Sequence, residues 1–165
     1  MRFPKVATLG LVALIVLACG GLKIPTIPPI PTGLFPSSLP QGSFDPNGMC
    51  RLLSVAEVGA VVGSAVTITA GTSDRCAYTA AQTFATINVR TETGDLTAAR
   101  FLLGDTAKEI TVGQYGGLAG TFVGSPLVYV LRGNDQLVLQ GVLIGADDAA
   151  VAKVVQLANA AASRW

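Results

Sequence analysis

Residues 127–144 read LVYVLRGNDQLVLQGVLI, and this stretch decides the fold class. Two segments rich in Val and Leu, 127–131 and 136–144, flank the loop Arg-Gly-Asn-Asp at 132–135. Aliphatic and β-branched segments on either side of a short loop that contains Gly and Asn are typical of a β-hairpin. We therefore expect two antiparallel strands here, within a larger antiparallel sheet.

Further strands are expected upstream of this hairpin. Residues 84–91 (FATINVRT) alternate, so that the Ala, Ile and Val share one face while Thr86, Asn88 and Arg90 share the other, as in a half-buried strand. The other expected strands are 65–70 (AVTITA), 76–80 (CAYTA) and 109–112 (EITV).

Three helices are expected from their capping residues. Ser54 and Glu57 form a capping box before a helix that Gly63 ends. The other two begin at Asp95 and at Asp147 or Asp148, and they end near Leu103 and Ser163. The resulting order, α-β-β-β-α-β-β-β-α, predicts an α+β domain in which an antiparallel sheet has its helices packed on one face.

The glycine-rich run 113–120 (GQYGGLAG) has two interpretations. It could cradle a phosphate, but it is not Gly-x-Gly-x-x-Gly and it precedes an expected strand rather than a helix. A tight turn and bulge between strands uses glycine for its tolerance of positive φ. We favour the turn.

The N-terminal segment has the pattern of an export signal. Residues 6–18 carry no charge, and Arg2 and Lys5 precede them. Thirteen apolar residues are fewer than the roughly 20 that a membrane-spanning helix needs. They fit the apolar region of a secretory signal peptide, which we assign to residues 1–18.

Val16-Leu17-Ala18-Cys19-Gly20 resembles the lipobox of bacterial lipoproteins, in which the cysteine is diacylated and becomes the new N-terminus. Leu17 is larger than the residue usual at its position. The resemblance implies lipidation of Cys19 and a membrane anchor, because two acyl chains suffice for stable anchoring. The alternative is that Cys19 is an incidental residue of an ordinary signal or of an uncleaved anchor.

Residues 19–44 are expected to be a proline-rich tether, and residues 45–165 a single α+β domain. The segment 20–48 holds seven of the nine prolines. Proline fixes φ and removes a backbone donor, so such a segment favours extended polyproline-II conformations.

Cys50 and Cys76 are an even pair in a chain expected to be exported, where disulfides persist. A structural disulfide between them would stabilise the fold by roughly 3–4 kcal/mol. A metal site would need further ligands, and the chain has no histidine. A redox pair is the remaining alternative, although it would favour Cys-x-x-Cys spacing.

The run 50–58 (CRLLSVAEV), followed by Gly63 and by CAYT at 76–79, resembles small lipoproteins of high-GC Gram-positive and related bacteria. These carry domains of unknown function. The resemblance covers about 120 residues and implies an α+β domain in which a Cys50–Cys76 bridge ties the first helix to the sheet. It implies no catalytic residue.

Composition argues against several classes of function. Without histidine, Ser-His-Asp and Cys-His arrangements are excluded, and we expect neither metal nor cofactor. Removal of residues 1–18 leaves nine basic and ten acidic residues, a net charge of −1 that does not favour nucleic acid. Asp147 and Asp148 could be half of a catalytic carboxylate pair or of a calcium site, but adjacent carboxylates at a helix start favour capping.

Asn88, Arg90 and Arg132 are the candidate ligand-binding residues. Asn88 and Arg90 share a polar strand face that a merely solvated sheet would explain equally well. We expect a non-enzymatic, lipid-anchored domain on the extracytoplasmic face of the cell membrane. Its partner would be an unidentified ligand, envelope component or protein. The alternatives are a carboxylate-only hydrolase of envelope glycans and a purely structural accessory subunit.

Overall fold

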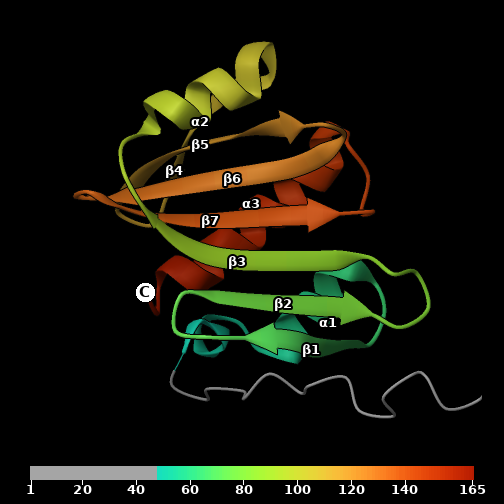
Figure 1. The fold of residues 1–165 in the computed structure, drawn as a ribbon. Coiled ribbons are helices and arrows are strands. Elements are labelled where there is room, and N and C mark those ends of the chain that lie inside the picture. Colours follow the sequence, from blue (N-terminus) through green and yellow to red (C-terminus); the bar gives the residue numbers. More distant parts are fainter. Residues whose placement is uncertain (1–47) are drawn as a thin grey trace, which may run out of the picture. The chain divides into compact units, whose positions relative to one another are not determined.

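A seven-stranded antiparallel sheet organises residues 48–165, the part of the chain that the computed structural model describes (Figure 1). The expected signal peptide (1–18), the lipidation site Cys19 and the tether (19–44) lie outside the described residues. The described elements are η1 (Met49–Leu52), α1 (Val55–Val62), β1 (Val66–Gly71), β2 (Arg75–Ala80), β3 (Thr86–Thr93), α2 (Leu96–Leu103), η2 (Gly104–Thr106), β4 (Lys108–Val112), β5 (Tyr115–Phe122), β6 (Ser125–Arg132), β7 (Asp135–Val142) and α3 (Asp148–Ala162).

The strand order is β1-β2-β3-β7-β6-β5-β4, and every neighbouring pair is antiparallel. Two meanders, β1–β3 and β4–β7, are therefore joined through the central pair β3–β7. Their register runs from Thr86 opposite Val142 to Thr93 opposite Asp135. The predicted α+β class, the antiparallel sheet and the hairpin at 127–144 are confirmed.

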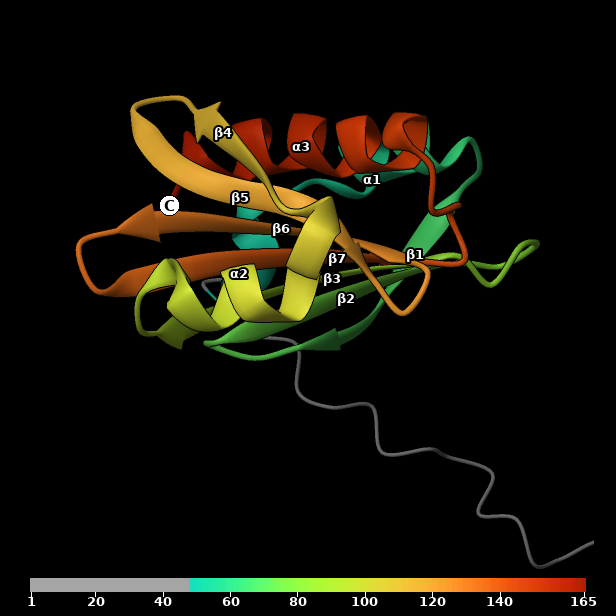
Figure 2. The same ribbon diagram turned by 90° about the horizontal axis from the view of Figure 1, so that it is seen from above.

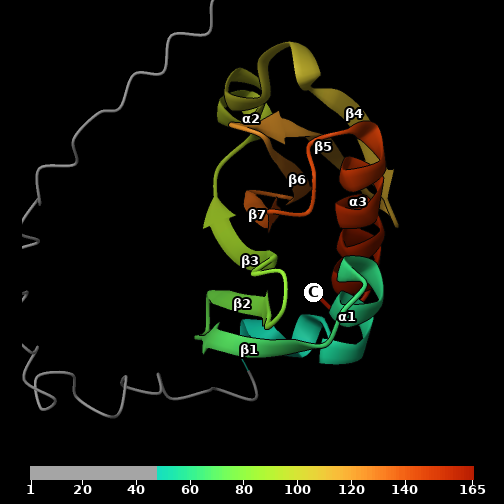
Figure 3. The same cartoon turned by 90° about the vertical axis from the view of Figure 1, so that its right-hand side faces the viewer.

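The helices lie on both faces of the sheet. Helices α1 and α3 cover one face, and α2 packs on the other (Figures 2 and 3). Val128 and Val130 contribute to the core under α1 and α3, whereas Leu127 and Tyr129 pack with α2. The expectation that all helices share one face is wrong for α2. A continuous apolar strand such as 127–131 is the pattern of burial on both faces, not on one.

The glycine-rich run is mostly strand. Its turn is limited to Gly113 and Gln114, and the remainder belongs to β5, which the sequence-based element order omits. Strand β5 runs so close to its neighbours that a Cβ at Gly117 would collide with the Tyr129 carbonyl oxygen. Glycine is required here by close backbone approach rather than by a turn. Four strands, not three, therefore separate α2 from α3, and the short η1 precedes α1.

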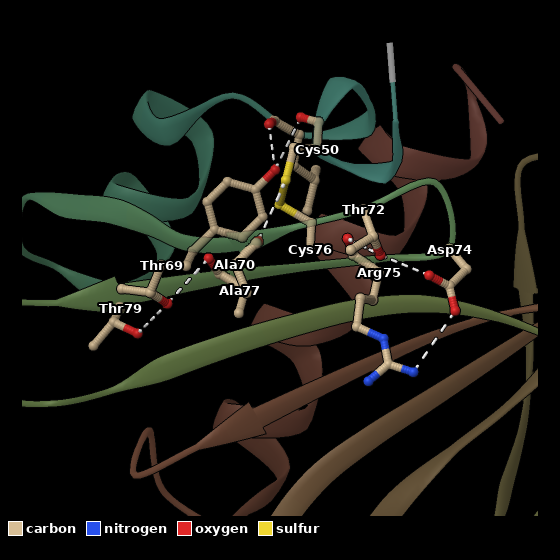
Figure 4. Close-up of a disulfide and its surroundings, with 11 residues drawn as sticks. Cys50, Thr69, Ala70, Thr72, Asp74, Arg75, Cys76, Ala77 and Thr79 are labelled. Atoms are coloured by element: carbon tan, nitrogen blue, oxygen red, sulfur yellow. Dashed lines mark hydrogen bonds and ion pairs between the residues drawn. A yellow bond between two sulfur atoms is a disulfide. The ribbon is translucent and has the colours of Figure 1, made fainter. Parts of the chain in front are cut away.

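The expected helix caps and the expected disulfide are confirmed. Ser54 and Glu57 form the capping box, and the side chains of Asp95 and Asp147 cap α2 and α3. Cys50 and Cys76 are disulfide-bonded with a Cα–Cα distance of 5.0 Å, which ties η1 to β2 (Figure 4). None of the helices in the described part of the chain combines the length and the hydropathy needed to cross a bilayer.

Candidate functional site

Helix α2 covers only part of its face of the sheet. Its core partners Leu118, Leu127, Tyr129 and Val138 belong to β5, β6 and β7. Within residues 48–165, no element covers the same face over β1, β2 and β3 (Figure 3). We call this surface the open face; its residues are Thr69, Arg75, Ala77, Thr79, Thr86, Asn88, Arg90 and Gln140.

Strand register places the polar side chains of the open face in rows. Arg75 of β2 lies directly opposite Arg90 of β3. In the next row, Asn88 lies between Ala77 of β2 and Gln140 of β7. Directly opposite residues have Cβ atoms about 5 Å apart, so these side chains can contact one ligand together. Asn88 and Arg90 share this face as the sequence predicts.

A hollow of about 420 Å³ opens between these rows. Its lining includes Asp74, Arg75, Asn88, Arg90, Glu92 and Gln140. The side chains of Asn88 and Gln140 are half-buried and make no hydrogen bond to another described residue. A carboxamide offers both donors and acceptors, so the two amides are available to a polar ligand.

The two arginines are each paired with a carboxylate. The Arg90 Nε lies 2.5 Å from the Glu92 carboxylate, and an Arg75 nitrogen lies 3.6 Å from the Asp74 carboxylate (Figure 4 shows the latter pair). Like charges directly across a strand pair destabilise a sheet, and the two carboxylates offset this repulsion. The hollow thus combines two cationic and two anionic groups.

Asp74 is held ionised mainly by a hydroxyl. The Thr72 hydroxyl donates to Asp74 Oδ1 at 2.6 Å and lowers the pKa of this carboxyl, and Arg75 contributes less. Further along the open face, the hydroxyls of Thr69 and Thr79 are 3.1 Å apart, and those of Thr79 and Thr86 are 3.4 Å apart. The surface therefore continues as a set of hydroxyls beside the hollow.

Arg132 lies apart from the other two predicted site residues. It follows Val128 and Val130 in the alternation of β6 and so lies on the α3 side of the sheet. Its guanidinium carbon is 4.1 Å from the centroid of the Trp165 ring, a cation–π contact. With Arg51 and Trp165 it lines a second hollow of about 600 Å³, which shares Thr91 and Glu92 with the first. The sequence-based strand ended at Leu131, which left the face of Arg132 undetermined.

Sequence reasoning missed Arg75 and Gln140. A signal for Arg75 was present, because Cys76 was expected to be buried in a disulfide and its neighbours in a strand must then face the other side. For Gln140 no such signal exists, since its place beside Asn88 depends on the pairing of β3 with β7.

The acidic residues considered for catalysis have other partners. Asp147 accepts a hydrogen bond from the Ala150 amide at 2.8 Å, and Asp148 pairs with Lys108 at 2.7 Å. In the described part of the chain, no group of three or more His, Cys, Asp or Glu side chains is arranged to hold a metal ion. The arrangement on the open face can bind through hydrogen bonds and ion pairs.

Comparison of the sequence with protein-family models finds no family that matches, and comparison with curated proteins finds no match.

Proposed function

We propose that this chain is a lipid-anchored binding protein of the extracytoplasmic face of the membrane, and that its ligand binds on the open face. The observation that carries the proposal is the hollow of about 420 Å³ in which the half-buried amides of Asn88 and Gln140 lie beside Arg90. Because both amides line the hollow, their donors and acceptors are open to a ligand that enters it.

The proposed location of the protein is supported by its N-terminal segment. The positive head at Arg2 and Lys5, the apolar segment 6–18 and the lipobox-like sequence before Cys19 support export and diacylation. The Cys50–Cys76 disulfide supports an oxidising compartment, since disulfides are rare in the cytosol. Mass spectrometry of the membrane fraction should detect a chain that begins at an acylated Cys19; an unmodified chain in the soluble fraction would contradict the anchor.

The ligand should be polar and rich in hydrogen-bonding groups. Two amides, two arginines and two carboxylates in one hollow suit a molecule that carries hydroxyls, amides and at least one ionised group. Glycopeptide fragments of the cell wall have this chemistry and are present where the anchor would place the domain. We therefore propose an envelope glycopeptide as the ligand class.

The test is titration of the full acylated chain, in detergent, with soluble disaccharide-peptide fragments by isothermal calorimetry. Arg90→Met removes a cation from the hollow and should weaken binding about tenfold or more, because a charge-assisted hydrogen bond contributes about 1.5–3 kcal/mol. Arg100→Met removes the partner of Glu109 away from the open face and is the matched control. Absence of measurable binding, or an equal effect of the two variants, would overturn the proposed ligand.

A further inference from the structure

One turn at the end of the sheet has an unexpected residue. The hairpins β4–β5 and β6–β7 both place glycine at the first turn position, Gly113 and Gly133, with φ of 60° and 62°. The β5–β6 hairpin has Val123 there instead, with φ of 48°, followed by Gly124 with φ of 72°. Turns with two positive φ values are normally built from Asn, Asp and Gly, because a β-branched side chain is strained in this region.

Two further bulky residues share this conformation. Phe84, in the β2–β3 connection, has φ of 55°, and Leu143, just after β7, has φ of 58°. Among residues 48–165, these two and Val123 are the non-glycine residues with positive φ. All three are solvent-exposed, to 70%, 70% and 86% respectively. Burial therefore does not compensate their strain, and a cost without a structural gain is typical of residues retained for function.

The three residues belong to one end of the sheet. Thr86 pairs with Val142, so Phe84 and Leu143 extend from neighbouring strand ends. The β5–β6 turn is at the same end, on the right of Figure 2. Helix α2 also ends there, because the Thr106 hydroxyl donates to the Thr121 carbonyl oxygen at 3.0 Å. We call this surface the apolar end; its exposed residues are Phe84, Phe122, Val123 and Leu143.

We propose that the apolar end inserts into the surface of the lipid bilayer to which the chain is anchored. This inference rests on the proposed anchor at Cys19. Between Cys19 and Gly48 lie 28 residues, which in a polyproline-II conformation reach up to about 90 Å. The bilayer is therefore always within reach of the domain.

The tether is also long enough to let this end face the membrane. The chain enters the domain at the opposite end, where the Met49 amide donates to the Thr72 carbonyl oxygen in the β1–β2 turn. The eight residues of β3 span about 27 Å. A reach of about 90 Å exceeds this length several-fold, so an anchored chain can turn either end of the sheet towards the membrane.

The charges near the apolar end supply no attraction to anionic headgroups, so the apolar side chains have to drive insertion. The segments 104–108 and 143–148 contain Asp105, Asp147 and Asp148 and a single cation, Lys108. Lys108 is paired with Asp148 at 2.7 Å. A surface with three carboxylates and one paired lysine gains nothing from anionic lipid, so insertion should be driven by apolar area and should persist in zwitterionic bilayers.

The test uses the full acylated chain in phosphatidylcholine vesicles whose acyl chains carry bromine, which quenches indole fluorescence on contact. Trp165 is the sole tryptophan, and it lies at the other end of the sheet against Arg132 and Tyr115. A chain with Phe84→Trp and Trp165→Phe should lose a large part of its fluorescence, because an apolar surface that binds the interface is buried about 5–10 Å into the headgroup and acyl boundary. The native chain, with its indole at position 165, should not change.

Two companion variants sharpen the result. Adding Val123→Ser and Leu143→Ser should reduce the quenching at position 84 several-fold, because the inserted apolar area is lost. Val55→Ser removes an exposed valine from the start of α1 and should have no effect. A vesicle-bound chain whose indole at position 84 is unquenched would overturn the proposal, as would crosslinking of the apolar ends of two copies. If the chain does not partition with vesicles and Cys19 is unmodified, the anchor itself fails, and this inference fails with it.

Discussion

The hydroxyl of Tyr78 donates to the carbonyl oxygen of Leu53 at 2.6 Å inside the core. The same hydroxyl lies 3.1 Å from the carbonyl oxygen of Cys50, and the Tyr78 side chain is fully buried. Burial raises the pKa of Tyr78 to about 12, so the hydroxyl remains a donor under ordinary conditions. The Tyr78 hydroxyl thus provides a hydrogen-bond donor for two buried carbonyl oxygens in the segment that leads from η1 to α1. Tyr78 is two residues from the disulfide-bonded Cys76 in β2.

Tyr78→Phe should destabilise the domain by about 1–3 kcal/mol, the cost of leaving buried carbonyl oxygens without a donor. Urea denaturation followed by circular dichroism measures the change. Tyr115→Phe is the matched control, because the Tyr115 hydroxyl accepts a bond only from the exposed Gln114 amide. Equal stability of the two variants would show that the Leu53 carbonyl finds another donor.

The disulfide should contribute a large part of the stability. Cys50 and Cys76 are both buried and are separated by 26 positions. Replacing both with alanine should lower the free energy of unfolding by about 2–5 kcal/mol. A reducing agent should lower the midpoint of thermal unfolding of the native chain but should not change that of the double variant. A midpoint that is insensitive to reduction in both would contradict a structural role for the bond.

An ion pair joins helix α1 to the C-terminal segment after α3 and should make the stability of the domain pH-dependent. Arg164 donates to both carboxylate oxygens of Glu57, at 2.6 and 2.9 Å. These bonds, with those from the amide and hydroxyl of Ser54, lower the pKa of Glu57 from 4.5 to about 2. The stability from this carboxylate is present above pH 4.5, where the unfolded chain is also ionised, and is lost as the pH falls towards 2.

Glu57→Gln should therefore reduce stability at neutral pH and flatten its decline between pH 4.5 and 2. Both partners are partly exposed, so the effect should be about 1 kcal/mol. The control is Glu109→Gln, which removes the more exposed partner of Arg100 and should change stability less. Urea denaturation across this pH range is the measurement, and a profile unchanged by Glu57→Gln would contradict the assignment.

The strained residues of the apolar end predict an unusual gain from glycine. Phe84→Gly and Leu143→Gly should each stabilise the domain by about 0.5–1 kcal/mol, because glycine adopts positive φ without steric cost and no buried contact is lost. Phe101→Gly, at a more exposed position within α2, should instead cost about 1 kcal/mol. Thermal unfolding distinguishes the two signs. A loss of stability at position 84 would mean that its side chain supports the fold.

The sequence predicts most elements of this fold because their signals are local. The Ser54–Glu57 capping box, the Asp95 cap and the alternation in 84–91 each depend on neighbouring residues, and the structure confirms them. The face of the sheet on which α2 packs could not be predicted from neighbouring residues, because it depends on which alternate residues of β6 contact a helix. The three predicted site residues do not form one site for the same reason: strand pairing places Arg90 and Arg132 on opposite faces of the sheet.

Strand β5 is the clearest case of a local signal that misleads, and it supplies the sharpest test of the packing. Gly116 and Gly117 are neighbours in one strand, and by composition alone both resemble turn residues. A Cβ at Gly117 would collide with the backbone of Tyr129, whereas a Cβ at Gly116 would meet nothing within 4 Å. Gly117→Ala should therefore destabilise the domain by about 2–3 kcal/mol, because the opposing atom is backbone and cannot move aside. Gly116→Ala should leave stability unchanged or slightly raise it, since alanine reduces the entropy of the unfolded chain. Urea denaturation of the two single variants decides the matter: equal effects would mean that β5 and β6 do not approach as closely as the glycine pattern requires.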